Sequence, residues 1–337
     1  FDIGAINNFL GKFFPAGFYY KTFMWPRSFW YKVYEPIIRK AAGFGAASIK
    51  HDEERYEHKY EYCDLLIAGS GPSGLASAYA AAQNGARVIL AEDKSRFGGS
   101  LLTSEVTIGN QSGQEWAEKI ISELKSMPNV VVKNRSQVFG YYDHNMLVMS
   151  ERISDHLPKT EKYIPKQRLW YIRAKEVIIS SGSIERPLVF GNNDTPGVML
   201  SSAAKEYLKI YGVLVGKKPL VFTNNDSGYE TAIEFKKNGI DPIVLDTRKD
   251  PNSEIIKEAK DLNINIKPSY VVVAAKGYKK VSSADIAKIS DDKKNISNIE
   301  NIKCDCICVS GFWTPTIHLA SQSGNKTKFN EEIDAFI

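Results

Sequence analysis

Two stretches of the chain repeat the same order of hydrophobic and polar positions. In the first, an apolar run over residues 65–68 leads into a glycine-rich turn, an alanine-rich helical segment and a second apolar run that ends on acids. In the second, apolar residues 219–222 precede a turn, a helical pattern over 229–237 and a short run, 243–246, that ends on Asp246. Short apolar runs bounded by turn residues and alternating with helices are typical of parallel βαβ units. The pattern therefore predicts an α/β fold with two Rossmann-like domains.

The first turn has the spacing Gly-x-Gly-x-x-Gly, at Gly69, Gly71 and Gly74. The first glycine permits the tight turn, the second lets the backbone approach a pyrophosphate, and the third allows helix and strand to pack closely. The free N–H groups at the start of the helix then face the phosphates. Glu92, about 20 residues further on, is placed to hydrogen-bond a ribose hydroxyl. We expect a dinucleotide here, and the motif alone leaves both FAD and NAD open.

The second turn lacks two of these glycines. Thr223 and Asn225 stand where the first two should be, and a Cβ atom at either position hinders the approach of the backbone to a pyrophosphate. We interpret the second unit as a degenerate repeat without ordinary nucleotide binding. After this unit, where we expect the chain to return to the first domain, Cys304, Cys306 and Cys308 alternate, which predicts one face of a strand. No C-x-x-C pair is present, so metal binding and disulfide reduction are both disfavoured.

Residues 1–60 differ from the rest. The segment 13–26 is crowded with aromatic residues, residues 31–42 favour a short helix interrupted near Pro36, and the charged stretch 51–62 is typical of a linker. The aromatic arm either packs over its own domain or contacts another subunit, and the sequence leaves both open. We expect a first domain over 61–200 plus 303–337, with a second domain, 201–302, inserted in it.

Composition excludes several classes of function. Among 337 residues the net charge is +5, and no basic run with interleaved aromatics suggests nucleic-acid binding. No apolar run is long enough to span a bilayer and no secretory signal is visible. Four cysteines without a disulfide-framework spacing fit a reducing cytoplasm. The chain begins at Phe1 and ends at Ile337, so we expect a piece of a longer polypeptide.

Several phrases together are more specific than the fold. They are Phe1-Asp2-Ile3-Gly4-Ala5-Ile6-Asn7, Ala16-Gly17-Phe18-Tyr19-Tyr20-Lys21-Thr22-Phe23-Met24-Trp25-Pro26, Glu185-Arg186-Pro187-Leu188-Val189-Phe190, Asn193-Asp194-Thr195-Pro196-Gly197-Val198-Met199, Thr223-Asn224-Asn225-Asp226 and the run from Ser310 to Gln322. With these phrases the whole chain resembles the α subunits of heterotetrameric sarcosine oxidases. Subunits of opine oxidase, proline dehydrogenase complexes and hydrogen cyanide synthase are related, and the fold implied is that of the pyridine nucleotide-disulfide oxidoreductases.

The resemblance implies a role in an enzyme with β, γ and δ subunits. The α subunit binds NAD in its Rossmann site and shares an FMN with the β subunit, whose FAD oxidises sarcosine. Electrons pass to oxygen, giving hydrogen peroxide, and a folate domain captures the one-carbon unit as methylenetetrahydrofolate. The chain would be the central part of such a subunit, without its ferredoxin-like and folate domains. We name no catalytic residue in it, because the family places substrate oxidation in another subunit.

The resemblance also assigns NAD contacts to matching positions. Gly69, Gly71, Pro72, Ser73 and Gly74 would lie at the phosphates, and Glu92, Asp93 and Lys94 around the adenosine ribose. Ser100 would lie after the Gly98-Gly99 pair, the backbone near Val138 would meet the adenine edge, and Gly311 to Thr314 would close the far side. In flavoproteins with two dinucleotide domains the strand that leads to Gly182 ends at the cofactor, so we also expect Gly182 to approach it closely. Two acids and a cation at 92–94 leave the ribose ligand open. An acid there disfavours NADP, whose 2′-phosphate would meet a negative charge.

Three functions compete. The first is the oxidase α subunit, which would act on sarcosine or on the opine, proline or glycine of a related complex. The second is a stand-alone oxidoreductase with FAD in the first Rossmann unit and NAD(P)H in the second. The third is a scaffold whose bound nucleotide stabilises the fold without turning over.

Overall fold

The computed structural model describes residues 11, 17, 23–43, 45, 47–158, 163–292 and 294–337. It divides into two units, Phe1–Glu54 and Arg55–Ile337, which are described separately. Most of the aromatic segment 13–26, apart from residue 17 and residues 23–26, lies outside the described residues.

The first unit contains two consecutive helical segments, the π-helix η3 (Trp30–Tyr34) and the α-helix α3 (Glu35–Ala41). The sequence predicted a helix interrupted near Pro36. Instead, Pro36 lies in the first turn of α3, directly after η3, and the first turn of a helix is a position that tolerates proline. The proline thus follows a change of helix type and does not break the helical path.

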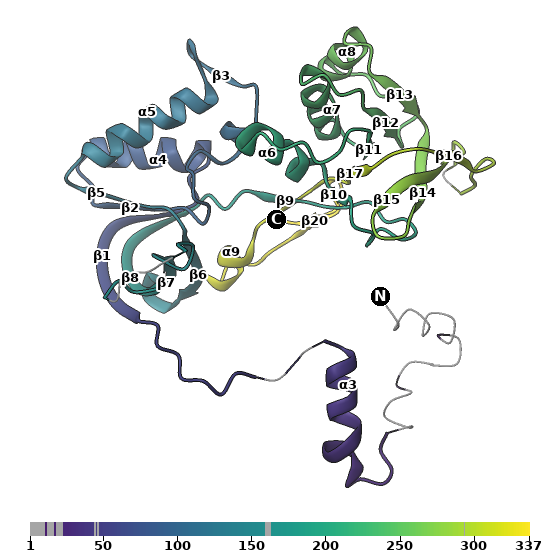
Figure 1. The fold of residues 1–337 in the computed structure, drawn as a ribbon. Coiled ribbons are helices and arrows are strands. Elements are labelled where there is room, and N and C mark those ends of the chain that lie inside the picture. The colour runs from purple at the N-terminus through teal and green to yellow at the C-terminus, as the bar shows by residue number, and fades with distance from the viewer. Residues whose placement is uncertain are drawn as a thin grey trace. The chain divides into compact units, whose positions relative to one another are not determined.

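The second unit begins with a six-stranded sheet in the order β5-β2-β1-β8-β7-β6. Its strands are β1 (Tyr56–Ala68), β2 (Val88–Ala91), β5 (Val130–Lys133), β6 (Ser136–Tyr142), β7 (Met146–Arg152) and β8 (Gln167–Ile179). The first four in the order are parallel, and β7 and β6 are antiparallel to their neighbours. Figure 1 shows α4 (Pro72–Gln83) and α5 (Gly113–Ser126) side by side over one face. Short elements fill the connections: η4 (Gly99–Leu102), β3 (Thr107–Ile108), β4 (Gln111–Ser112) and η5 (Asp143–Asn145).

Strand β1 begins earlier than the sequence predicted. Residues 56–62, expected in a linker, pair with β8 in a continuous parallel ladder. Tyrosines and charged residues alternate there, so this is a period-of-two pattern, but it is exposed and lacks the aliphatic residues of a buried strand. Cross-strand pairs stabilise it, including the stacked rings of Tyr60 and Tyr171, whose centroids are 5.1 Å apart.

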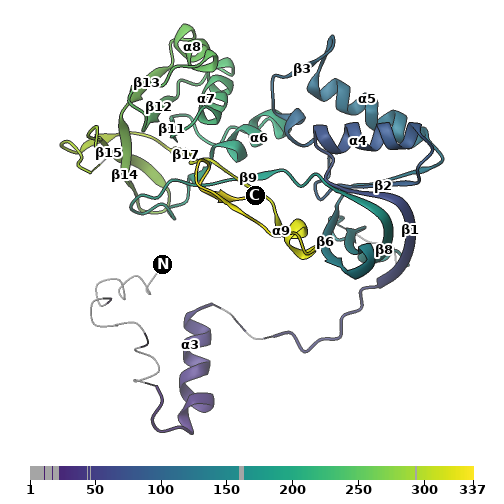
Figure 2. The same cartoon turned by 180° about the vertical axis from the view of Figure 1, so that it is seen from behind.

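A second sheet contains five parallel strands in the order β10-β17-β11-β12-β13. They are β10 (Val198–Leu200), β11 (Pro219–Thr223), β12 (Ile243–Asp246), β13 (Asn265–Pro268) and β17 (Cys306–Ser310). Helices α6 (Ser201–Tyr211), α7 (Ser227–Lys237) and α8 (Glu254–Asp261) share a core with one face. The antiparallel strands β14 (Tyr270–Gly277), β15 (Val281–Lys288) and β16 (Glu300–Ile302) form a further sheet that packs on the other face (Figure 2).

One strand lies in a different sheet from the one its expected domain suggested. Residues 303–337 were assigned to the first domain, but β17 pairs with β10 and β11 of the second sheet. The chain leaves that sheet only after β17, through a ribbon in which β18 (Trp313–Pro315) pairs with β9 (Ser183–Glu185). Beyond it lie α9 (His318–Gln322), β19 (Phe329–Asn330) and β20 (Ala335–Phe336).

The alternating cysteines occupy two cores. Cys306 and Cys308 share the helix-covered face of the second sheet, with their Sγ atoms 3.6 Å apart. Cys304, which precedes the strand, belongs to the core on the opposite face. The expectation of one shared face therefore holds only for the two cysteines inside β17.

Candidate functional site

The turn between β1 and α4 is built from three glycines with different roles. Gly69 has a positive φ of 106°, and a Cβ atom there would lie 2.2 Å from the carbonyl oxygen of Ser180. A Cβ atom on Gly74 would lie 2.0 Å from the carbonyl oxygen of Gly69. These two glycines are therefore required by the packing of the turn itself. Gly71 differs, because a Cβ atom there would meet nothing within 4 Å.

The open space at Gly71 lies at the start of α4, of which Gly71 is the N-cap. A second glycine pair closes one side of it, since Gly98 donates its N–H to the Ser70 carbonyl oxygen at 3.0 Å and a Cβ atom on Gly99 would lie 2.9 Å from the Cα of Gly71. Pro72 and Ser73, in the first turn of the helix, are exposed. This arrangement presents helix N–H groups to an open cradle, as an anion site requires.

Glu92 is buried directly after β2, and its carboxylate holds the glycine turn in place through hydrogen bonds to Ser70. Its Oε2 accepts hydrogen bonds from the Ser70 N–H at 3.0 Å and from the Ser70 hydroxyl at 2.5 Å. Its Oε1 accepts one from the Lys94 N–H at 2.9 Å. A carboxylate oxygen can accept two hydrogen bonds, so Oε1 retains capacity for a ribose hydroxyl. Sequence reasoning missed Ser70, whose signal is its place between the first two glycines.

The two residues after Glu92 each have a charged partner. The Arg152 guanidinium donates to the Asp93 carbonyl oxygen at 2.5 Å and to Oδ1 at 3.2 Å. The Lys94 ammonium contacts both carboxylate oxygens of Glu206 at 2.9 and 2.8 Å. Neither partner was expected, because they lie far along the chain from residues 93 and 94.

Of the remaining predicted contacts, some lie near the glycine turn and Glu92, and others lie far from them. The start of β6 lies beside the acid, because the N–H of Ser136 donates to the Glu92 carbonyl oxygen at 2.7 Å, and Val138 follows on the same strand. Gly182 lies three residues after the end of β8, and the N–H of Thr316 donates to its carbonyl oxygen at 2.9 Å. Ser100, exposed in η4, follows Gly99 at the mouth of the cradle.

Gly311 and Thr314 lie along the ribbon instead. Thr314 pairs with Ile184, and Gly311 packs against the backbone of Arg186, to which it donates its N–H at 2.7 Å. Three residues, those of β9, separate Arg186 from Gly182, and the four steps between them span about 13 Å at the rise of a strand. The structure thus places Gly311 at the second sheet and does not bring it to the glycine turn.

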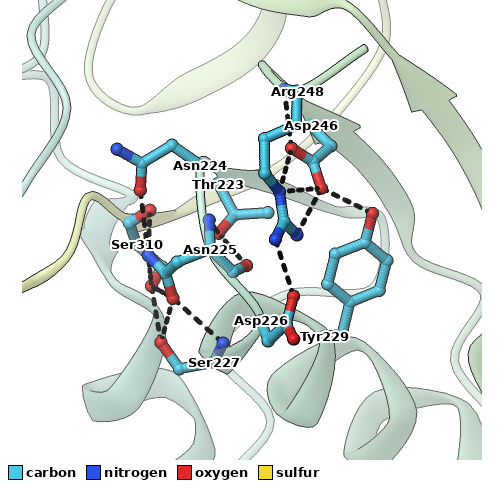
Figure 3. A network of polar contacts seen from close by, with 9 residues as sticks. All are labelled: Thr223, Asn224, Asn225, Asp226, Ser227, Tyr229, Asp246, Arg248 and Ser310. Atoms are coloured by element: carbon cyan, nitrogen blue, oxygen red, sulfur yellow. Dashed lines mark hydrogen bonds and ion pairs between the residues drawn. The ribbon is translucent and has the colours of Figure 1, made fainter. Parts of the chain in front are cut away.

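In the second turn, the side chains of the chain itself occupy the cradle (Figure 3). The hydroxyl of Thr223 donates to the Asn225 carbonyl oxygen at 2.8 Å and accepts from the Asn225 N–H at 3.1 Å. The carboxamide oxygen of Asn225 accepts from the N–H of Ser227 at 2.9 Å, at the start of α7. That N–H is one of the groups that would bind a phosphate in an open site.

The acid of the second Rossmann unit is also fully hydrogen-bonded within the chain. Asp246, at the end of β12 and completely buried, accepts from the Tyr229 hydroxyl at 2.8 Å and from the Arg248 guanidinium at 2.8 and 3.1 Å. Arg248 also contacts Asp226 at 2.8 Å. Burial and the charge of Asp246 raise the pKa of the Tyr229 phenol well above its usual range, so it stays a donor. The turn and the acid of the second Rossmann unit are therefore both occupied by the chain's own side chains, as expected of a degenerate repeat.

Gly228 shows what the second turn has retained. A Cβ atom on it would lie 2.6 Å from the Cβ of Thr223, so this glycine still serves close packing of helix and strand.

Other kinds of site find no support within the described ranges. They contain no group of three or more His, Cys, Asp or Glu residues arranged to hold a metal ion. In those same parts of the chain, no helix combines the length and apolar character needed to cross a bilayer. Burial raises the pKa of the Cys63 and Cys304 thiols to about 12, which leaves both thiols protonated and poorly nucleophilic.

Comparison with known proteins agrees with this geometry. The family described as "Pyridine nucleotide-disulphide oxidoreductase" matches residues 63–335. The α subunit of sarcosine oxidase from Rhizobium meliloti (strain 1021) is 41% identical over 338 residues, covering 100% of this chain and 33% of the relative. The corresponding α subunit from Corynebacterium sp. (strain U-96) is 32% identical over 298 residues, covering 88% and 31%. The chain thus spans about a third of the length of these relatives, and the predicted resemblance is confirmed.

Solved structures support the fold. Thioredoxin reductase of T. acidophilum superposes with a TM-score of 0.61 at 17% identity, covering 80% of this chain and 83% of that one. L-proline dehydrogenase from P. horikoshii gives a TM-score of 0.59 at 20% identity, covering 86% and 49%. The family match implies flavin binding and a nucleotide-binding Rossmann unit. With its paired Rossmann-like sheets and a family match over most of its length, the chain belongs to the pyridine nucleotide-disulphide oxidoreductase family.

Proposed function

We propose that this chain is part of an α-type subunit of a multi-subunit, flavin-dependent amine oxidase, and that it holds one NAD in the cradle at Gly71. The sarcosine oxidase α subunits among its relatives support the enzyme class, and a component of opine oxidase from Agrobacterium tumefaciens, 26% identical over 205 residues, supports the wider group. In such an enzyme sarcosine, oxygen and tetrahydrofolate would give glycine, hydrogen peroxide and methylenetetrahydrofolate.

The observation that carries the proposal is the contrast between the two turns. A stand-alone oxidoreductase of this fold needs an FAD in one Rossmann unit and a nicotinamide nucleotide in the other. Here the first cradle is open at Gly71. In the second turn the side chain of Asn225 already accepts the N–H of Ser227 at the helix start, and the guanidinium of Arg248 is already paired with the acid Asp246. One bound dinucleotide fits a subunit that supports chemistry carried out elsewhere.

The residues around the first cradle suit binding better than catalysis. The one hydroxyl held against the carboxylate of Glu92 is that of Ser70, which is completely buried and bonded at 2.5 Å. A nucleophile must reach its substrate, so this pair positions the turn and does not react. We therefore place substrate oxidation, with FAD, in a β-type partner, and an FMN at the interface with it.

The remaining partners follow from the same proposal. They are γ- and δ-type subunits, and the four buried, unpaired cysteines fit a cytoplasmic complex. The NAD would bind through its phosphates at the start of α4 and through its ribose at Oε1 of Glu92. Hydride exchange is the chemistry a nicotinamide supplies, but tight binding stabilises the fold whether or not it occurs.

The alternative places FAD in the first cradle. The family match favours it, because the same glycine turn binds FAD in flavoproteins and the family implies flavin. A related opine-, proline- or glycine-oxidising complex would share either arrangement, since its substrate pocket would lie in the partner.

One experiment separates these alternatives. The chain is purified alone and with its co-expressed partners, denatured, and the released nucleotides are identified by mass spectrometry. We expect one NAD per isolated chain without flavin, and FMN and FAD only in the complex. Release of FAD from the isolated chain would instead assign the Gly71 cradle to a flavin. Bound NAD that sarcosine fails to reduce under anaerobic conditions would favour a structural nucleotide.

A further inference from the structure

Lys94 lies beside the acid that is expected to bind the adenosine ribose. Its N–H donates to Oε1 of Glu92 at 2.9 Å, which places its backbone within the site. Its ammonium group points to helix α6 and contacts both carboxylate oxygens of Glu206 at 2.9 and 2.8 Å. Although the Lys94 side chain is 57% exposed, its charge is therefore already paired.

A cation at this position has a specific chemical consequence. NADP differs from NAD by a phosphate on the 2′-oxygen of the adenosine ribose, and Rossmann sites that accept NADP place a basic side chain there. Lys94 has the charge and the location for that task. Glu206 competes for it directly and adds a further negative charge near an incoming phosphate.

Arg152, a second cation near the acid, is occupied in the same way. Arg152 donates to the carbonyl and carboxylate oxygens of Asp93, one residue before Lys94. A 2′-phosphate that paired with Lys94 or with Arg152 would thus have to displace a carboxylate from that side chain. From this arrangement we infer that Glu206 is a specificity-determining residue, which keeps Lys94 engaged and so selects NAD against NADP. The inference rests on the proposed binding of NAD in this cradle.

Helix α6 does not depend on Glu206 for its position. Lys209, one turn further along α6, pairs with Glu105, which lies in the connection between η4 and β3, and with Glu234 at 3.4 Å. The inner face of α6 is also held by the buried residues Ala204 and Leu208. Removing the charge of Glu206 should therefore free Lys94 without moving the helix.

The test uses Glu206→Gln in the full chain, with Glu105→Gln as the matched control. Glu105→Gln weakens the ion pair between Glu105 and Lys209 of α6 but leaves Lys94 paired with Glu206. Nucleotides are released from protein purified from one expression host, and the molar ratio of NADP to NAD is measured. Kd values for the two nucleotides are then compared on protein stripped of nucleotide.

We expect Glu206→Gln to raise the relative affinity for NADP about tenfold, the worth of one charge-assisted hydrogen bond. Adding Lys94→Met to this variant should cancel the gain, which a merely loosened helix would not do. Unchanged discrimination in Glu206→Gln, or an equal gain in Glu105→Gln, would overturn the inference. If every form released FAD and bound neither nicotinamide nucleotide, the proposed function itself would fail, and the inference with it.

Discussion

Substituting alanine for single glycines of the first turn should separate nucleotide binding from folding. In Gly71→Ala the added methyl group meets nothing within 4 Å, and the backbone at φ −66° suits any residue. Its effect on the free energy of unfolding of the nucleotide-free protein should stay below about 1 kcal/mol, since a small unfolded-state gain opposes a slightly poorer N-cap. The methyl group does occupy the space through which a pyrophosphate approaches the backbone.

Gly74→Ala is the contrasting change. Its methyl carbon would lie 2.0 Å from the Gly69 carbonyl oxygen, whereas ordinary contact begins at 3.4 Å. Helix α4 and the turn must therefore separate by more than an ångström, and both sides of the contact are backbone. Overpacking of this kind costs about 1–3 kcal/mol, and more where the backbone has to move. Gly74→Ala should thus be clearly destabilised even without nucleotide.

Two measurements test this pair. The first is the nucleotide released per chain together with its Kd, and the second is the urea midpoint of nucleotide-free protein, because bound ligand would itself stabilise the fold. We expect Gly71→Ala to keep its midpoint and to bind about 10–100 times more weakly, the cost of one or more hydrogen bonds to a charged group. Wild-type affinity in Gly71→Ala would refute the placement of the pyrophosphate at this glycine. A wild-type midpoint in Gly74→Ala would refute the packing argument.

Three further predictions concern other parts of the unit Arg55–Ile337. Burial alone would raise the pKa of Glu151, but an indole N–H and two cations hold it below its ordinary value, so its stabilising effect exists above that value and is lost as the pH falls. The melting temperature of Glu151→Gln should therefore fall less than that of wild type between about pH 5 and 3, whereas exposed Glu176→Gln should follow wild type. Because the pKa of Cys63 and Cys304 is raised to about 12, a thiol reagent at neutral pH should modify them only after unfolding, and rapid labelling of folded protein would contradict this. Asn225→Ala should cost about 1 kcal/mol in urea unfolding, because a helix-start N–H loses its acceptor, and a gain of nucleotide binding would show that the second cradle is closed by this residue alone.

The sequence predicted what depends on neighbouring residues. The glycine turn, the acid at the end of the second strand and the degenerate second turn all lie in short segments with a characteristic spacing, so the fold class could be inferred. Partners that meet through the tertiary fold could not be. Glu206 reaches Lys94 from a helix of the other layer, and nothing in the spacing of the two residues indicates the contact.

Two boundaries were missed for a related reason. The first half of β1 is exposed on a parallel ladder, and its charged residues resemble those of a linker. Strand β17 is apolar on both sides, which predicts a buried parallel strand but does not say in which of the two sheets it lies. Its pairing with β10 and β11 decides that.

The two turns together also explain why Gly71 is the glycine that most favours a bound ligand. Glycine costs conformational entropy on folding, so a position that keeps it without a steric need requires another reason. Gly74 and Gly228 occupy equivalent positions, and each is enforced by packing against its own turn. At the position of Gly71 the second turn has Asn225, whose side chain caps the helix that a phosphate would otherwise cap. The fold therefore tolerates a side chain at this position, and the proposed ligand, which must come close to the backbone, would account for the absence of one in the first turn.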